Sequence, residues 1–463
     1  MQKKEQQKNL LKYCSALIIT GLHMALWACF WLEYYANIMP RTFGWKGHLL
    51  VVAVYGVLMC LFTSLYGGYR VGYYRREDVA LSGVLGAIFA NFITYLQTCL
   101  IGAKIVSPGP FLVMTLIQAV LIFTWAVVAT SLYTRIFPPH KMLMVYGGSD
   151  LAQRLIIKMI TRSEKYQIRE TISVDEDYER VCAKILEYRV IILCDVPAGL
   201  RNRLLKFCYM HSVRTYTTPK ISDIFIRGAI NISLFDTPLL LNRNCGLALE
   251  QRVFKRALDL FLAVFGLVVF SPFFLLIPIV IKLYDGGPVV YSQDRLTLNG
   301  KVFKVYKFRS MCVDAEKDGA QLSTQEDERV TPVGRLMRAI RFDELPQLLN
   351  ILRGDMSVVG PRPERPEIAQ EYLRTMPEFS YRLKVKAGLT GYAQVVGRYN
   401  TTPYDKLKLD LMYISNYSLA EDFKLIFMTL KILFIKDSTQ GIANGAKHAN
   451  APMKPNDAEK PSE

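Results

Sequence analysis

Histidine is scarce in this chain of 463 residues, and cysteine is scattered along it. Only five His are present, with none between Gln251 and Lys447, and the nine Cys include no CxxC pair. These absences exclude a Cys/His zinc site and a disulfide framework, and they favour a reducing environment for the polar parts of the chain. Any chemistry in the C-terminal half must therefore use carboxylates, lysine, arginine or hydroxyl groups.

Acidic residues are also few, and the chain as a whole is apolar. Lys and Arg number 57 against 40 Asp and Glu, which gives a formal net charge of +17. Hydrophobic residues make up 51% of the chain and the mean hydropathy is +0.18, which is high for a soluble protein. A membrane protein with large polar domains fits these values, and its positive charge suits anionic lipids or phosphate-bearing substrates. Because no nucleic-acid-binding motif is present, we expect no nucleic-acid partner.

Four apolar stretches contain no Asp, Glu, Lys or Arg: Tyr13–Leu32, Leu49–Tyr66, Val79–Ile101 and Phe111–Tyr133. Each is long enough for a membrane-spanning helix, since a bilayer core requires about 20 residues. We therefore predict a membrane bundle of four spans. Within it, the polar residues His23, Asn91 and Gln118 are expected to form hydrogen bonds between helices.

The charges in the short loops predict how these spans are oriented. Lys and Arg are concentrated on the side of the N-terminus, at Lys3, Lys4, Lys8, Lys12, Arg70, Arg75, Arg76, Arg135 and Lys141. The opposite loops hold only Arg41, Lys46 and Lys104. By the positive-inside rule, the N-terminus and everything after residue 134 are expected in the cytoplasm.

A fifth apolar run, Leu260–Ile281, is long enough to span but is not expected to cross. Lys and Arg flank it on both sides, and Ser271-Pro272 interrupts its middle. Proline removes a backbone donor and clashes with the preceding turn, so the helix should kink near Ser271. A re-entrant helix that returns to the cytoplasmic face fits both features, with an ordinary kinked span as the alternative.

The soluble middle of the chain alternates between strand and helix patterns. Met142–Tyr146 and Arg189–Cys194 are short apolar strands, each followed by a helical pattern, which predicts a Rossmann-like α/β domain. The turn after the first strand lacks GxGxxG, so the nucleotide-binding signal is weak. Tyr216 and Lys220 have the YxxxK spacing of some sugar-nucleotide dehydrogenases and epimerases. The proline between them argues against a shared helix, and we interpret the pair as a turn.

Two adjacent acids, Asp343 and Glu344, stand just before a predicted helix that begins with a proline and ends at Gly354. The partial positive charge of a helix N-terminus favours carboxylates and phosphates, and Arg338 and Arg341 add to it. By itself, this pattern is typical of ordinary helix capping.

The neighbouring motifs favour phosphate chemistry. A strand is predicted over Val302–Phe308, and Gly/Pro turns and a glycine-rich stretch follow further along the chain. Glycine allows a backbone to approach phosphate closely, and arginine binds phosphate with two donors. The candidate phosphate-binding residues in these segments are Lys307, Arg309, Arg362, Gln394 and Arg398. With an acid pair and neither His nor a Cys nucleophile, the set suits phosphoryl transfer onto or past a carboxylate, with a divalent metal screening charge.

Residues 251–435 resemble the bacterial sugar transferases, which are polyprenyl-phosphate hexose-1-phosphate transferases of the monotopic phosphoglycosyl transferase class. The motifs that carry the resemblance are KRALDL, the Ser271-Pro272 break, DGGPVVYSQDR, YKFRSM, DELPQLLNILRGDMSVVGPRPERPE, KAGLTGYAQVVGR and DLMYISNYSL. The four spans and the Rossmann-like middle resemble the large subgroup that begins exopolysaccharide, capsule or O-antigen synthesis. Two departures stand out. The family often has Arg-x-Gly where Arg295-Leu-Thr297 stands here, and many members have Thr/Ser-Leu where Arg341-Phe342 stands.

This resemblance implies a ping-pong reaction. Asp343 would attack the β-phosphate of a UDP-hexose and release UMP, and undecaprenyl phosphate would then take the phosphosugar. Glu344 would orient the nucleophile or, together with Asp343, hold Mg²⁺ or Mn²⁺. The phosphate or nucleotide site would be lined by Lys307, Arg309, Arg338, Arg341, Arg362, Gln394 and Arg398. Glucose and galactose are both plausible sugars, with glucose slightly ahead, and Arg341 puts the sugar in doubt.

The expected organisation has four parts: a four-helix transmembrane domain (1–135), a regulatory or structural Rossmann-like domain (136–245), a monotopic α/β catalytic domain with a re-entrant membrane helix kinked at Ser271 and Pro272 (246–436), and a disordered tail (437–463). Within the catalytic domain, the charged apolar segment Leu419–Ile435 suits an interfacial helix. The resemblance implies a multi-pass protein of the bacterial inner membrane whose catalytic domain faces the cytoplasm. Its expected partners are UDP-hexose, undecaprenyl phosphate and membrane lipids, with homodimerisation left open.

Two other functions stay open on the residues alone. A sugar-nucleotide dehydratase or epimerase would act through the middle domain, but the missing GxGxxG and the proline in YTTPK count against it. A non-catalytic assembly subunit would not need the intact acid pair.

Overall fold

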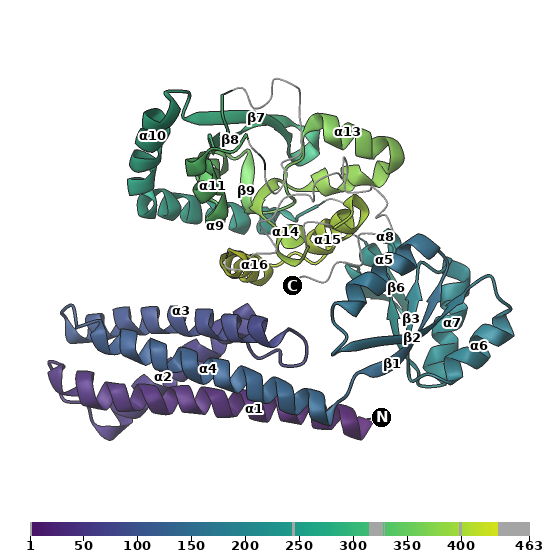
Figure 1. Cartoon of the computed structure of the whole chain (residues 1–463), viewed down its shortest axis with the longest axis horizontal. Helices are drawn as coiled ribbons and strands as arrows, with labels where there is room; N and C mark the ends of the chain where they lie inside the picture. Colours follow the sequence, from purple (N-terminus) through teal and green to yellow (C-terminus); the bar gives the residue numbers. More distant parts are fainter. Residues whose placement is uncertain (1, 243–245, 314–326, 328, 398–400, 434–463) are drawn as a thin grey trace. The chain divides into compact units, whose positions relative to one another are not determined.

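The computed structural model describes residues 2–242, 246–313, 327, 329–397 and 401–433 (Figure 1). They form two compact units, of which the first ends at Lys220 and the second begins at Ile221. The predicted disordered tail, 437–463, lies outside the described residues.

Four long helices open the first unit: α1 (Gln2–Phe30), α2 (Trp45–Tyr66), α3 (Arg76–Gly102) and α4 (Gly109–Ile136). The four predicted apolar stretches coincide with them, except that the first runs on into the π-helical turn Trp31–Tyr35. All four helices are long and apolar enough to cross a membrane, and they lie side by side in Figure 1. The prediction of four spanning helices is confirmed to that extent.

A closed triangle of hydrogen bonds joins three of these helices. Asn91 on α3 donates from Nδ2 to Oε1 of Gln118 on α4 over 2.8 Å. Gln118 in turn donates to the hydroxyl of Tyr55 on α2 over 2.6 Å, and that hydroxyl donates to Oδ1 of Asn91 over 3.1 Å. The interhelical role predicted for Asn91 and Gln118 is thus confirmed. Nδ1 of the buried His23 has no hydrogen-bond partner among the described residues.

The rest of the first unit is an α/β domain with one parallel sheet in the order β2-β1-β3-β4. Its strands are β1 (His140–Tyr146), β2 (Tyr166–Ser173), β3 (Val190–Cys194) and β4 (Arg214–Thr217). The connecting helices are α5 (Ser149–Ile160), α6 (Tyr178–Leu186) and α7 (Ala198–Met210). The predicted alternation of strand and helix is confirmed. The turn predicted at Tyr216 is wrong, because Tyr216 pairs with Ile192 inside the sheet.

The second unit combines short helices with two-stranded sheets. Its elements after Lys220 are α8 (Ile221–Arg227), β5 (Ile230–Leu234), β6 (Thr237–Leu241), α9 (Leu249–Val269), α10 (Ser271–Asp285), β7 (Val290–Leu296), β8 (Val302–Phe308), α11 (Pro332–Ala339), α12 (Gln347–Arg353), β9 (Met356–Val359), α13 (Pro366–Thr375), β10 (Ala387–Thr390), α14 (Tyr392–Val396), α15 (Pro403–Ser415) and α16 (Leu419–Ile432). Strands β7 and β8 pair antiparallel, whereas β9 and β10 pair parallel. Helix α8 belongs here because Ile224 packs with Leu407 and Leu411 of α15.

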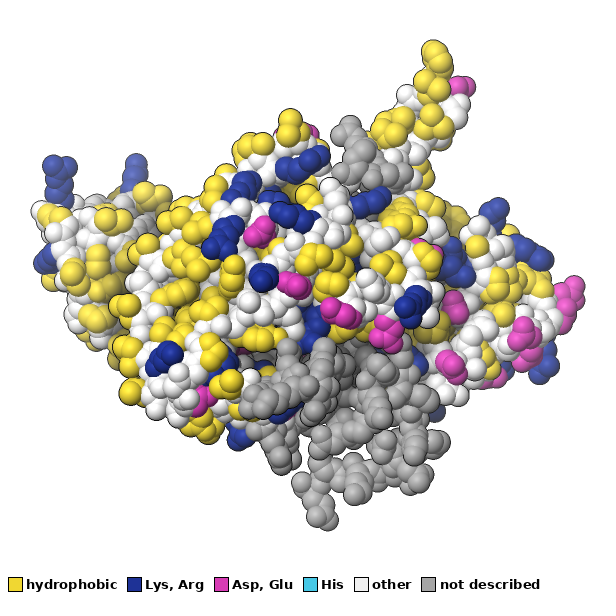
Figure 2. Space-filling view, turned by 90° about the horizontal axis from the view of Figure 1, so that it is seen from above, with side chains coloured by type: hydrophobic (Ala, Val, Ile, Leu, Met, Phe, Trp, Pro, Cys, Tyr) yellow, Lys and Arg dark blue, Asp and Glu magenta, His cyan; other side chains and the backbone are white. Residues whose placement is uncertain are grey.

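Helices α9 and α10 form an apolar pair bent by 60° at Phe270. Ser271 donates its hydroxyl to the carbonyl of Val268 over 2.8 Å, and Pro272 lies in the first turn of α10. The predicted kink is therefore confirmed. The outer side chains are apolar, with Leu275 70% and Leu283 82% exposed, and hydrophobic side chains gather over this part of the second unit in Figure 2. Such a bent pair suits a broken span or a re-entrant helix.

The polar side of α9 is buried against the domain that follows it. Lys255 lies 2.7 Å from Asp422 of α16 and donates to the Tyr413 hydroxyl of α15 over 3.0 Å. Asp259 accepts from the backbone N–H of Val358 in β9 over 2.8 Å. These charged residues attach α9 to the rest of the second unit.

Arg256 gives α9 a further attachment. It donates to the carbonyls of Ile351 and Leu352, over 2.6 and 2.8 Å, at the end of α12. The motif KRALDL thus bonds α9 to α12, β9, α15 and α16. Its charged residues, Lys255, Arg256 and Asp259, therefore have a structural role.

We expect Lys255→Met to destabilise the protein by about 3–5 kcal/mol, because Asp422 would be left as an unpaired buried carboxylate. The double variant Lys255→Met/Asp422→Asn should recover most of this loss. Thermal unfolding in detergent measures the difference.

The matched control is Lys424→Met, which removes the half-exposed pair with Glu421 on the same helix. It should change stability by less than about 1 kcal/mol. Equal effects of Lys255→Met and Lys424→Met would contradict a stabilising role for the buried pair.

Candidate active site

The two predicted acids lie in a single 3₁₀ turn, Phe342–Glu344, between α11 and α12. Arg341, just before the turn, has a left-handed backbone with φ of +56°, an unusual conformation for a residue other than glycine. Both Asp343 and Glu344 are buried, with 8% and 9% of their surface exposed. Helix α12 begins at Gln347, and Gly354 ends it in the left-handed conformation, as the sequence predicts.

Three of the predicted binding residues converge on Glu344. Lys307 of β8 lies 2.9 Å from Oε1, Arg362 lies 3.8 Å from the same oxygen, and Arg341 lies 3.9 Å from Oε2. Burial alone would raise the pKa of Glu344, but Lys307, Arg362 and Arg341 together outweigh burial and lower that pKa to about 2. Glu344 is therefore held as a carboxylate at neutral pH.

Asp343 has the opposite character. Burial raises its pKa, and the negative charge of Glu344 raises it further, against the opposing effects of Lys307, Arg338 and Arg341. A more basic carboxylate is a better nucleophile once it is ionised. The turn thus presents one acid fixed as an anion beside a second acid whose charge is less well stabilised.

The remaining predicted site residues have other contacts. Arg338 donates from Nε to the Ser310 hydroxyl over 2.8 Å. Arg309 pairs with Asp285 at the end of α10, and it occupies the space in which Gly287 would otherwise carry a side chain. The described contacts therefore tie Arg309 to the DGGP turn rather than to the acids.

Two predicted residues from the glycine-rich stretch are not joined to the acids by any described contact. Gln394 is half-buried on α14, and its Nε2 has no partner among the described residues. Arg398 lies outside the described residues.

Gly360, Gly388 and Gly391 are required by the close packing of two backbone segments. A Cβ on Gly388 or Gly391 would collide with the backbone of Gly360, and a Cβ on Gly360 would collide with the carbonyl of Lys386. Gly360, which follows β9, can approach β10 and the residue after it only because these residues have no side chain. The close approach observed here is between two backbone segments, whereas the sequence suggested an approach to phosphate.

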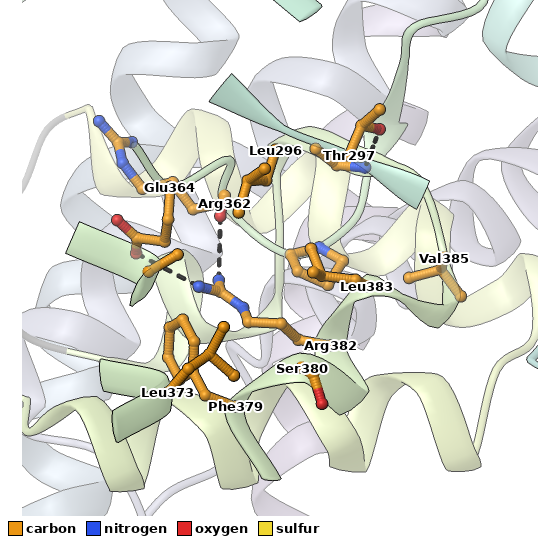
Figure 3. Close-up of a pocket in the computed structure, with 13 residues that line it drawn as sticks. Leu296, Thr297, Arg362, Glu364, Leu373, Phe379, Ser380, Arg382, Leu383 and Val385 are labelled. Atoms are coloured by element: carbon orange, nitrogen blue, oxygen red, sulfur yellow. Dashed lines mark hydrogen bonds and ion pairs between the residues drawn. The ribbon is translucent and has the colours of Figure 1, made fainter. Parts of the chain in front are cut away.

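Arg382, which sequence analysis missed, fixes the loop that carries Arg362. It donates to the Arg362 carbonyl over 2.9 Å and to Glu364 over 3.3 Å, as Figure 3 shows, and it lies 2.8 Å from Asp410. Arg382 is buried in the 3₁₀ segment Pro377–Lys384, and only a fold-level contact, invisible in the local pattern, identifies its role.

A small cavity lies beside Arg382, with apolar side chains such as Leu373, Phe379 and Val385 in its wall. Its volume of about 20 Å³ is enough for one water molecule. We therefore regard it as a packing defect next to the Arg362 loop and not as a substrate pocket.

Phe342 connects the acid turn to the helix bend. Its ring centroid lies 4.8 Å from that of Phe273 and 5.8 Å from that of Phe270, both in edge-to-face geometry. The residue that precedes Asp343 thus packs on the point where α9 meets α10. The sequence singled out Arg341-Phe342 as a departure from the family, and the structure gives Phe342 this packing role.

A divalent metal would find two carboxylates here. No group of three or more Asp, Glu, His or Cys suited to a metal occurs among the described residues. Mg²⁺, however, is commonly held by one or two carboxylates together with substrate phosphates. Asp343 and Glu344 fit that kind of site.

We expect Asp343→Asn and Glu344→Gln to change stability in opposite directions in metal-free buffer at neutral pH. Glu344 has a lowered pKa, so its stabilisation is present above the unfolded pKa near 4.5 and is lost as the pH falls through about 2. Replacing it should remove roughly 3 kcal/mol. Asp343 has a raised pKa, so its ionised form destabilises the fold above that pKa, and the amide should raise the melting temperature.

Thermal unfolding in the presence of a chelator measures both changes. The gain from Asp343→Asn should shrink as the pH falls and the native carboxyl takes up its proton. A lower melting temperature for Asp343→Asn at neutral pH would contradict the charge assignment.

Comparisons with known proteins agree with the motifs. Residues 250–436 match the family described as bacterial sugar transferase. The chain is 30% identical over 414 residues to the UDP-N-acetylgalactosamine-undecaprenyl-phosphate N-acetylgalactosaminephosphotransferase of Aeromonas hydrophila, covering 87% of this chain and 89% of that protein. It is 38% identical over 253 residues to the UDP-glucose:undecaprenyl-phosphate glucose-1-phosphate transferase of Klebsiella pneumoniae, covering 54% of this chain and 53% of that protein.

A third relative is the UDP-glucose:undecaprenyl-phosphate glucose-1-phosphate transferase of Escherichia coli. It is 39% identical over 210 residues, which cover 44% of this chain and 44% of that protein. The two glucose transferases are thus matched over about half of their length, whereas the Aeromonas protein is matched over most of it. On this combined evidence, the chain is a transferase that belongs to the bacterial sugar transferase family.

Proposed function

We propose that this protein transfers a hexose-1-phosphate from a UDP-hexose to undecaprenyl phosphate and releases UMP, as the first membrane step of polysaccharide synthesis. The observation that carries the proposal is the buried acid pair, Asp343 and Glu344, surrounded by Lys307, Arg341 and Arg362. The names of the relatives support the acceptor and the donor class.

In the proposed first step, a carboxylate oxygen of Asp343 attacks the β-phosphorus of the donor. The bond from that phosphorus to the oxygen bridging the two phosphates breaks, and UMP leaves with the bonding electrons. In the second step, a phosphate oxygen of undecaprenyl phosphate attacks the same phosphorus and frees Asp343. The raised pKa of Asp343 favours this role, because a weakly stabilised carboxylate gains from forming a bond.

The basic residues have a task in both steps. Lys307, Arg341 and Arg362 neutralise Glu344 in the resting site, and they would stabilise the donor diphosphate at Asp343. Asp343 and Glu344 would hold Mg²⁺ or Mn²⁺ together with phosphate oxygens, and such an ion would screen the charge of the diphosphate.

The bent pair α9–α10 would place this chemistry at the depth of the lipid headgroups. We propose that it is re-entrant, so that both ends lie on the cytoplasmic side of the inner membrane, where UDP-sugars are made. Its exposed apolar surface supports burial in lipid, and the packing of Phe342 on Phe270 and Phe273 supports a fixed height for the acid turn.

The proposed reaction does not depend on which sugar the UDP donor carries. Glucose and galactose were expected from the resemblance, whereas the Aeromonas hydrophila relative, matched over 89% of its length, has N-acetylgalactosamine in its name. The preferred donor can be identified by incubating the enzyme with polyprenyl phosphate, Mg²⁺ and each of a panel of UDP-sugars, and by measuring the release of UMP. A dehydratase or epimerase would alter the sugar without releasing UMP, and a non-catalytic subunit would give neither product.

We expect Asp343→Asn to reduce UMP release by roughly three orders of magnitude or more, because the nucleophile is lost. Mass spectrometry of wild-type enzyme quenched without the lipid acceptor should show a phosphohexose adduct on Asp343. The matched control is Asp294→Asn, which makes the same change on the exposed face of β7 and should leave activity unchanged. Near-normal UMP release by Asp343→Asn would disprove the nucleophile assignment.

Cysteine labelling in whole cells tests re-entry. In a variant whose native cysteines are replaced by serine, Lys301→Cys, beyond α10, should resist a membrane-impermeant maleimide. Lys104→Cys, in the loop between α3 and α4, is the control that should be labelled in the orientation predicted from loop charge. Labelling of both positions would show that the bent pair crosses the membrane.

A further inference from the structure

The loop that carries Arg362 is stiffer than a simple connection between β9 and α13 requires. Pro361 and Pro363 flank Arg362, and Pro366 ends the loop at the start of α13. Proline fixes its own φ and restricts the backbone of the residue before it. The backbone on both sides of Arg362 therefore has little freedom.

Hydrogen bonds from outside the loop fix the same residues. The carbonyl of Arg362 accepts from Arg382 over 2.9 Å, that of Pro363 from Arg295 over 3.1 Å, and that of Glu364 from the N–H of Leu296 over 3.0 Å. Three consecutive carbonyls are thus bonded to β7 or to the 3₁₀ segment Pro377–Lys384. The loop is attached at every residue from 362 to 364.

The guanidinium of Arg362 is held less tightly than its backbone. The side chain is 47% exposed, and its distance of 3.8 Å from Oε1 of Glu344 is too long for a hydrogen bond. The loop, rather than the ionic partner, therefore sets the place of Arg362 beside the acid turn. A guanidinium in this state can bind an incoming phosphate without first breaking a strong bond.

Two acids hold Arg382 in place. Figure 3 shows its guanidinium between Glu364 and the Arg362 carbonyl, and Asp410 of α15 lies 2.8 Å from it. Arg382 and Asp410 are both buried. Burying such a pair costs desolvation energy, and apolar residues in the same place are often equally stabilising. The position that the pair gives to Arg362 explains it better than stability does.

We propose that Arg382 and Asp410 are positioning residues for Arg362. Asp410 fixes the guanidinium of Arg382, and Arg382 fixes the carbonyl of Arg362. The loop then presents the Arg362 side chain beside the acid turn. This inference rests on the proposed function, in which Arg362 binds a phosphate of the UDP-sugar. Arg382 and Asp410 act only through the loop and not on the donor itself.

The test is a double-mutant cycle on the full chain in phospholipid nanodiscs, with UMP release from the preferred UDP-sugar as the readout. Arg382→Lys keeps the buried positive charge but lacks the guanidinium fork, so it cannot bond both acids and the carbonyl. It should raise the KM for the UDP-sugar about tenfold, because a misplaced Arg362 binds phosphate poorly. A partly misfolded enzyme would instead lower kcat at unchanged KM.

In an Arg362→Ala background, Arg382→Lys should change KM by less than about twofold, because the residue through which it acts is absent. Asp410→Asn, which keeps the shape of the side chain, should show the same dependence on Arg362. The matched control is Arg374→Lys, the same change at an exposed position of α13, which should keep the wild-type KM. A tenfold effect of Arg382→Lys in both backgrounds would overturn the proposal, and so would an unchanged KM for Arg382→Lys alone.

UDP affinity repeats the cycle without turnover. Arg382→Lys should weaken UDP binding about tenfold only where Arg362 is present. If the enzyme binds UDP in this way but releases no UMP, the proposed reaction is refuted and the positioning role is supported. If it releases UMP and the two substitutions act additively, the positioning role alone is refuted. Absence of both UDP binding and UMP release would overturn both proposals.

Discussion

The structure of the second unit depends on the placement of two adjacent carboxylates in one buried turn. Two such acids cannot both be ionised cheaply, because each raises the pKa of the other. Three cations from separate segments stabilise the ionised form of Glu344. They are Lys307 of β8, Arg341, which has a left-handed backbone just before the turn, and Arg362 of the loop after β9. Arg382 fixes that loop from behind. The cations around the turn therefore stabilise Glu344 as an anion, whereas the charge of Asp343 is less well stabilised.

Helix α9 combines an exposed apolar surface with a polar attachment to the rest of the second unit. A helix of a soluble protein buries its apolar side, whereas α9 buries charge and exposes apolar side chains. Lys255, Arg256 and Asp259 each bond to a different part of the unit. Ala263 adds an apolar contact with the core around Leu348 and Ile351. Its outer surface is apolar and exposed. The aromatic contact of Phe342 with Phe270 and Phe273 then transmits the position of the bend to the acid turn.

Local features of this architecture could be predicted from the sequence. The kink at Ser271, strand β8 and helix α12 with its glycine end follow from proline, alternation and capping, which act within a few residues. Features that depend on pairing across the chain could not. Asp259 and Val358 are 99 positions apart, and the partners of Arg382 and Arg309 are equally invisible to a local pattern. Gly388 and Gly391, in and after β10, were assigned to phosphate because the sequence does not reveal the backbone that approaches them.

The positive-inside rule explains why the loops of the bundle carry positive charge, but it does not explain where the cations lie in the fold. The positive-inside rule requires cations on one side of the bundle, and scattered surface lysines would satisfy it. A cleft in the first unit instead gathers cations from the helix ends and from the sheet, with few acids among them. In the acid turn, comparable cations are matched by Asp343 and Glu344 within the fold. The sign of the charge on this side of the bundle is therefore predictable from the sequence, whereas the set of cations that share one cleft depends on contacts across the fold.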